Sequence, residues 1–186
     1  MTRLVTLPRQ TTIYTCGAAC LAAVSRLRGG TLKEMDLAHV MHAQPIIGIT
    51  NNMLMNTAKS QGAENCGENI WNGKQLAVLN ILNPISGVGH YVVALRTEDE
   101  SGDVIVYCPY YANTLRLSVR WLEHHWISGD RVYRKWAITF PMILEQQTLC
   151  IGEAWPEMGL EPGEMNPHWL LRSARRAIAN LAAQEV

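Results

Sequence analysis

The sequence has no excess of charge of either sign and no long apolar run. Lys plus Arg and Asp plus Glu number 16 each among 186 residues, and charged residues make up only 17% of the chain. Without a net positive field, no nucleic-acid partner is expected. No run of about 18 apolar residues is present to span a bilayer, and the first ten residues lack the apolar core of a secretory signal. The sequence as written predicts a cytoplasmic protein.

Paired cysteine motifs are also missing. Five cysteines are scattered along the chain without a Cys-x-x-Cys pair, namely Cys16, Cys20, Cys66, Cys108 and Cys150. This odd set argues against a disulfide framework and against a zinc ribbon. No known metal-ligand spacing relates Cys66 and Cys150 to His39, His42 and His124. We therefore expect neither a metal nor an organic cofactor. Free thiols are the expected state.

The rest of the composition fits a globular domain with two different halves. Hydrophobic residues make up 48% of the chain, which suits one core of this size. Apolar spacing predicts helices over 16–28, 31–43 and 51–63, the second with a capping box formed by Thr31 and Glu34. Short β-branched runs predict strands over 76–82, 90–95, 103–108 and 135–144. The charged stretch 96–103 predicts a hairpin loop between two antiparallel strands.

The composition changes near residue 146. Gly, Pro and Glu are frequent over 149–166, as is typical of a connector. Residues 167–186 place their apolar side chains on one helical face. We therefore expect a domain over 1–145, followed over 146–186 by a connector and a C-terminal amphipathic helix. That helix either packs on the domain or extends from it toward a partner or a membrane surface. No feature of the sequence indicates an oligomeric state.

Cys16 stands where a polar, Thr-rich segment changes to an apolar helix. The positive end of a helix dipole favours a thiolate, and a neighbouring imidazolium favours it further. His90 is the best general base because it follows a Gly-rich turn and begins an apolar strand, from which its ring can project into a cleft. The competing histidines are His39, His42, His124, His125 and His168.

Gln10 precedes Cys16 by six residues. A loop of this length can fold back beside the thiol, so the Gln10 amide and the Cys16 backbone N–H can together bind an oxyanion. Taken singly, a cysteine here is more often a small buried residue, a histidine a surface residue and a glutamine a turn residue. Their combination and order instead favour acyl-transfer chemistry.

These residues resemble a known family. The Gln-x5-CGAACLAAV segment, the downstream GHYVV and the strand that ends before a proline are similar to the bacteriocin-processing cysteine peptidases, over about Leu4 to Phe140. Members remove leader peptides after a double glycine, usually at the N-terminus of an ABC exporter. The resemblance implies an α+β, papain-like fold with a helical N-terminal half packed on an antiparallel sheet from the C-terminal half. It also implies Cys16 as nucleophile, His90 as base and Gln10 at the oxyanion hole.

The chain departs from the family pattern at one position. The family usually has Asp-Pro after the strand that follows the histidine, and the aspartate orients the imidazole; here Cys108 precedes Pro109. A neutral thiol cannot stabilise an imidazolium as a carboxylate does, so either a slow dyad operates or another group orients His90. Asn113 and Asp103 are the nearest candidates. The exporter domains have no counterpart, which predicts a free-standing bacterial enzyme or an inactive relative.

Three functions stay open at this stage. The first is a cysteine peptidase or related amide hydrolase acting through a thioester on a glycine-containing leader peptide or another protein. The second is a deamidase-type effector toxin, secreted by a non-classical route, that acts on glutamine or asparagine side chains through the same thioester. The third is a peptide-binding module that kept the cleft and lost turnover.

Overall fold

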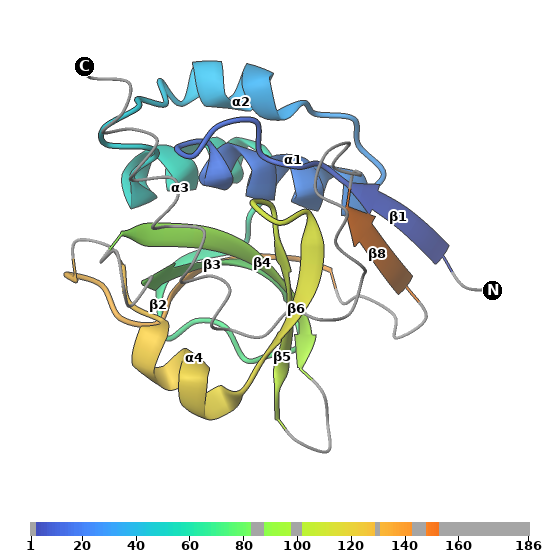
Figure 1. The fold of residues 1–186 in the computed structure, drawn as a ribbon, viewed down its shortest axis with the longest axis vertical. Coiled ribbons are helices and arrows are strands. Elements are labelled where there is room, and N and C mark those ends of the chain that lie inside the picture. The colour runs from blue at the N-terminus through green and yellow to red at the C-terminus, as the bar shows by residue number, and fades with distance from the viewer. Residues whose placement is uncertain (1–2, 83–87, 98–101, 129–130, 143–147, 153–186) are drawn as a thin grey trace.

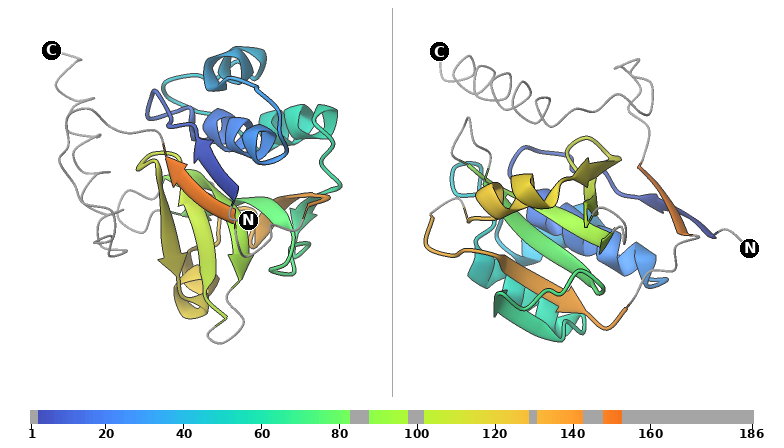
Figure 2. Two further views of the ribbon diagram at one scale, coloured as in Figure 1. Left: turned by 90° about the vertical axis from the view of Figure 1, so that its right-hand side faces the viewer. Right: turned by 90° about the horizontal axis from the view of Figure 1, so that it is seen from below.

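The fold is a layer of helices on an antiparallel sheet, seen from three directions in Figures 1 and 2. The computed structural model describes residues 3–82, 88–97, 102–128, 131–142 and 148–152. In the N-terminal half it has three helices, α1 (Cys16–Leu27), α2 (Glu34–Val40) and α3 (Asn51–Ser60), which lie together on one side of the sheet. This arrangement confirms the predicted α+β class.

The sheet comes from the part of the chain that follows the three helices. Its strands are β2 (Asn65–Glu68), β3 (Leu76–Leu82), β4 (Gly89–Thr97), β5 (Val104–Cys108), β6 (Asn113–Leu117) and β7 (Trp136–Phe140). They follow the order β2-β7-β3-β4-β5-β6, and every neighbouring pair is antiparallel. The predicted antiparallel pairing of the strand that begins near His90 with the strand that ends at Cys108 is confirmed.

Helix α1 fixes the helical layer to the sheet. All its residues are buried except Ser25 and Arg26. Its small side chains allow a close approach: a Cβ atom at Gly17 would lie only 3.2 Å from atoms of Leu54 and Tyr91. One apolar core fills the space between the helices and the face of the sheet that they cover. A second core lies on the opposite face, under helix α4 (Val119–His125).

Two strands outside the main sheet join the ends of the described chain. Strand β1 (Arg3–Leu7) pairs in parallel with β8 (Thr148–Gly152), and the two lie side by side in Figure 2. Residues 149–152 thus form a strand in the stretch where composition predicted a connector. A Cβ atom at Gly152 would overlap the carbonyl oxygen of Ala112, so β8 packs tightly on the turn after Cys108. The predicted helix over 167–186 lies outside the described residues.

Helix α2 does not begin as predicted. Its first residue is Glu34, and its N-cap is Lys33, with no side-chain capping bond. The expected capping box with Thr31 is therefore wrong. The Glu34 carboxylate is buried and instead accepts hydrogen bonds from Thr11 and Thr15 in the segment before α1. No helix among the described residues is long and apolar enough to cross a membrane.

Candidate active site

Cys16 is the first residue of α1, and its side chain is 7% exposed. Backbone N–H groups of Tyr91, Gly17 and Cys16 itself lower the pKa of this thiol and favour the thiolate. Burial has the larger effect, however, and with a smaller contribution from the Glu34 carboxylate it raises the pKa of the thiol above its ordinary value. The Cys16 thiol is therefore neutral at pH 7, contrary to the thiolate that the helix dipole led us to expect.

His90 is the second residue of β4, and its Nε2 atom lies 3.2 Å from the Cys108 sulfur. Burial lowers the pKa of His90 to about 4. The Cys108 side chain, at the end of β5, is fully buried, which raises its pKa to about 12. Both groups are thus neutral at pH 7. The structure places Cys108 where the resemblance implied an orienting carboxylate.

A thiol in this position leaves the tautomer of His90 unspecified. A carboxylate can only accept a hydrogen bond, so it would fix a proton on Nε2 and leave Nδ1 free to act as a base. The Cys108 thiol can either accept from Nε2–H or donate its own proton to Nε2. In the second case the ring proton sits on Nδ1, and His90 cannot take a proton from a nucleophile there.

The structure brings Cys16 next to His90 through the backbone. One backbone N–H that favours the Cys16 thiolate belongs to Tyr91, the residue after His90. No direct hydrogen bond joins Cys16 to the His90 ring in the described part of the chain. Such bonds are often long in proteins without substrate and shorten when it binds.

Gln10 lies beside the turn that follows Cys108. Its backbone N–H donates to the Pro109 carbonyl at 3.0 Å, and its side chain is 7% exposed. The side-chain Nε2 donates to the Thr12 carbonyl at 2.7 Å, while the buried Oε1 atom has no partner. One Nε2–H is thus used to orient the amide. The second is available to an oxyanion, the role predicted for Gln10.

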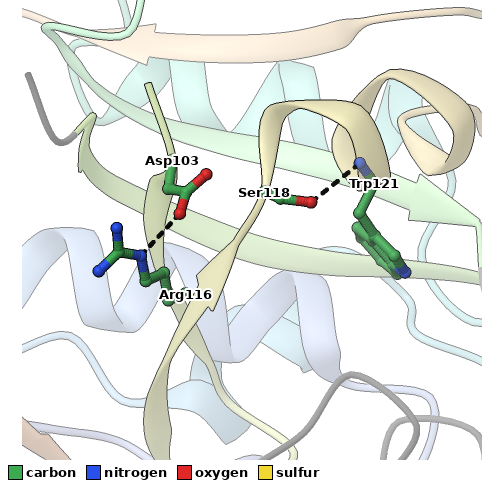
Figure 3. Close-up of polar contacts among 4 residues, drawn as sticks. All are labelled: Asp103, Arg116, Ser118 and Trp121. Atoms are coloured by element: carbon green, nitrogen blue, oxygen red, sulfur yellow. Dashed lines mark hydrogen bonds and ion pairs between the residues drawn. The ribbon is translucent and has the colours of Figure 1, made fainter. Parts of the chain in front are cut away.

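The alternative orienting groups are differently placed. Asp103 precedes β5, at the end away from Cys108, and binds Arg116 at 2.7 Å (Figure 3). Asn113 pairs with Cys108 in the sheet register, but its side-chain oxygen accepts from the Thr114 backbone N–H. Among the described residues, the hydrogen-bonding partner of the His90 ring is Cys108.

The other described histidines lie on α2 and α4 or in the turn after α2. His39 and His42 belong to α2 and the turn after it, whereas His124 and His125 end α4, which begins at the Ser118–Trp121 cap drawn in Figure 3. Both α4 histidines use Nδ1 to contact backbone carbonyls. His168 lies outside the described residues. No group of three metal-binding side chains is found in the part of the chain that the structure describes.

Comparison with known proteins places the fold. No protein-family model and no curated protein matches the sequence. A solved structure does match, the peptidase domain of Streptococcus ComA, which is described as a bifunctional ABC transporter involved in a quorum-sensing pathway. The match has a TM-score of 0.58 and 18% identity, and it covers 72% of this chain and 96% of that domain. The chain has a papain-like peptidase fold. The fold that the bacteriocin-processing resemblance implied is thereby confirmed.

The lowered pKa of His90 predicts a loss of stability in acid. Its pKa is about 4 in the folded protein, against an ordinary value of 6.5. The unfolded chain therefore binds more protons between these pH values, and stability falls as pH drops from about 6.5 to about 4. We expect His90→Gln to reduce this fall, measured as the urea midpoint at pH 7 and pH 4.5. His124→Gln, on α4, is the control. Equal pH dependence in the wild type and His90→Gln would contradict this assignment.

Proposed function

We propose that the chain is an amide hydrolase of the cysteine peptidase type. Cys16 is the nucleophile, His90 is the base, and Gln10 together with the Cys16 backbone N–H binds the oxyanion. The observation that supports this most strongly is the position of Cys16 at the start of α1, where Gly17 packs against Tyr91, the residue after His90. It sets a cysteine at a helix N-terminus beside the backbone of a strand-end histidine, within a peptidase-domain fold.

Acylation begins when the Cys16 sulfur attacks the substrate carbonyl carbon while His90 Nδ1 takes the thiol proton. The new C–S bond leaves a negative charge on the carbonyl oxygen, which the Gln10 amide and the Cys16 N–H stabilise. Collapse of this intermediate breaks the C–N bond, and His90 gives its proton to the leaving amine. Water then attacks the thioester with His90 as base, which releases the acid and restores the thiol.

The neutral resting state makes this reaction slow. Because the pKa of Cys16 is raised and that of His90 is lowered to about 4, no thiolate–imidazolium pair is formed in advance. The proton must move during the attack, and the Cys108 thiol gives the developing imidazolium little support. The enzyme therefore works as a Cys16–His90 dyad.

The surroundings of the thiol favour a substrate with small residues at the cleavage point. Cys16 and Gln10 are each only 7% exposed, so a scissile carbonyl must approach both residues closely to react. Glycine has no side chain to accommodate there. We therefore propose a glycine-containing peptide segment, such as a leader peptide, as the substrate.

A peptide-binding module is the second candidate, and Cys108 is the observation that favours it. A cleft without an orienting carboxylate can bind a glycine-containing segment and turn it over too slowly to matter. The two candidates differ in whether a covalent intermediate forms on Cys16.

The test uses peptides with and without an internal Gly-Gly bond. We expect fragments from the Gly-Gly peptides and, in samples quenched with acid, a transient acyl adduct on the tryptic peptide that contains Cys16. A mass gain of about one dalton with ammonia release and an intact chain would indicate a deamidase instead, since hydrolysis of the same thioester gives that product. Binding without any adduct or product would indicate the peptide-binding module.

A further inference from the structure

Glu34 is a buried carboxylate next to the candidate active site. It begins α2 and is 5% exposed. Its two oxygens accept from the Thr11 backbone N–H at 2.9 and 3.1 Å, and one also accepts from the Thr11 hydroxyl at 3.2 Å. The Thr15 hydroxyl donates to the same carboxylate. One side chain from a separate helix therefore holds both ends of the segment 11–15, which we call the oxyanion loop.

The oxyanion loop connects the two proposed oxyanion donors. Gln10 immediately precedes it, and Cys16 immediately follows it. Inside the loop, the Gln10 amide is oriented by the Thr12 carbonyl at 2.7 Å, and the Thr12 backbone N–H donates to the Thr15 hydroxyl oxygen at 3.2 Å. A shift of Thr11 or Thr15 would therefore move both the Gln10 amide and the Cys16 N–H.

We propose that Glu34 is a positioning residue that sets the oxyanion hole by holding the oxyanion loop. The inference rests on the proposed function, because it assigns Glu34 to the same reaction. The hydrogen bonds of Glu34 go to Thr11 and Thr15 and not to the oxyanion donors themselves. Its effect on Gln10 and Cys16 is therefore indirect.

The charge of Glu34 supports a role in positioning. The carboxylate contributes to the raised pKa of Cys16 and so disfavours the reactive thiolate. A charged acceptor is, however, the group that binds two backbone or hydroxyl donors most strongly. Glutamine has one acceptor oxygen in place of two and no charge, so it would hold the loop less firmly.

The first test separates oxyanion stabilisation from nucleophile reactivity. Glu34→Gln is expected to lower kcat for peptide hydrolysis about tenfold with little change in KM. Alkylation of Cys16 by iodoacetamide forms no oxyanion, and removal of the nearby negative charge favours the thiolate. Its rate is expected to stay the same or rise. Asp36→Asn, an exposed change on the same helix, is the matched control and should alter neither rate.

A double-mutant cycle tests whether Glu34 acts through Gln10. Gln10→Ala removes an oxyanion donor and is expected to lower kcat about 100-fold. In the Gln10→Ala variant, only the Cys16 N–H remains as an oxyanion donor for Glu34 to position. Adding Glu34→Gln to this variant should therefore lower kcat by a further threefold at most. Thr15→Ser keeps the hydroxyl that binds Glu34 and should retain activity. Thr15→Val removes this hydroxyl and should lose activity. Fully additive losses from Glu34→Gln and Gln10→Ala would overturn the proposal.

Alkylation and hydrogen exchange of Glu34→Gln give two further tests of the positioning role. A parallel fall in hydrolysis and in alkylation of Glu34→Gln would show general disruption of the site and overturn the proposal. Hydrogen exchange gives a readout that needs no turnover, because the Thr11 amide donates to Glu34. Faster exchange of the oxyanion-loop amides in Glu34→Gln supports the proposal, and unchanged exchange overturns it. A wild-type protein that hydrolyses nothing counts against the proposed function, and the exchange result then still decides the role of Glu34 in ordering the loop.

Discussion

Replacing Cys16 by alanine is expected to abolish hydrolysis, with a fall in kcat/KM of at least about 1000-fold, because no other group can form the thioester. Cys20→Ala is expected to retain activity within about threefold, in keeping with the small effect of a change away from the reacting atoms. Cys20 lies one turn further along α1, is fully buried, and has a pKa raised well above its ordinary value by burial. It shares the helix and the thiol chemistry of Cys16 but not its position at the helix N-terminus.

The two variants should be compared by product formation from a Gly-Gly peptide and by thermal unfolding. Unfolding temperatures close to that of the wild type would confirm that the fold survives both changes. Loss of activity in Cys20→Ala together with retention in Cys16→Ala would contradict the assignment of the nucleophile. Loss in both, with folding intact, would indicate that hydrolysis depends on the packing of α1 as a whole.

Replacing Cys108 by aspartate is expected to raise kcat/KM by about 100-fold or more. In a serine protease, replacing the orienting aspartate by a neutral amide costs about 10,000-fold, and the main cause is the wrong histidine tautomer. The Cys108 sulfur lies 3.2 Å from His90 Nε2, within reach of a carboxylate on the same backbone position. The new carboxylate would raise the pKa of His90 from about 4 and stabilise its imidazolium.

The control for this change is Cys108→Asn, which has the shape of aspartate without its charge. Activity should rise in the aspartate variant only. The pH profile should change as well, since an imidazolium beside Cys16 would let the thiolate form at lower pH. Because Cys108 is fully buried, thermal unfolding must show that each variant is folded. A folded aspartate variant without activity would mean that the thiol of Cys108 has a role of its own.

Much of the fold could be predicted because the signals are local. Helix α1 and strand β3 coincide with runs whose apolar spacing is unambiguous, and the charged stretch 96–103 correctly predicted the antiparallel pairing of β4 with β5. Strands β1 and β8 were missed because their pairing joins residues from opposite ends of the described chain. Strands β2 and β6 are short and contain polar residues, so they gave no strand pattern.

The sequence proposed the members of the candidate site but could not indicate its electrostatics. Cys16, His90 and Gln10 came from motif order, and the position of Cys108 followed from the hairpin that joins it to His90. The neutral resting state could not be predicted, because it depends on tertiary burial that opposes the helix dipole. Glu34 matched a capping pattern in the sequence, yet its side chain turns toward Thr11 and Thr15. The only sequence signal for that contact was a group of hydroxyl residues before Cys16.

The central claim is that Cys16 and His90 act together as nucleophile and base. The most direct test is the rate of iodoacetamide alkylation of each cysteine, followed by mass spectrometry from pH 5 to 9, in the wild type and in His90→Ala. We expect His90→Ala to slow Cys16 alkylation at pH 7 at least tenfold, as loss of a general base does, while the partly exposed Cys66 is unaffected. Cys16 alkylation that does not change when His90 is removed would contradict the account.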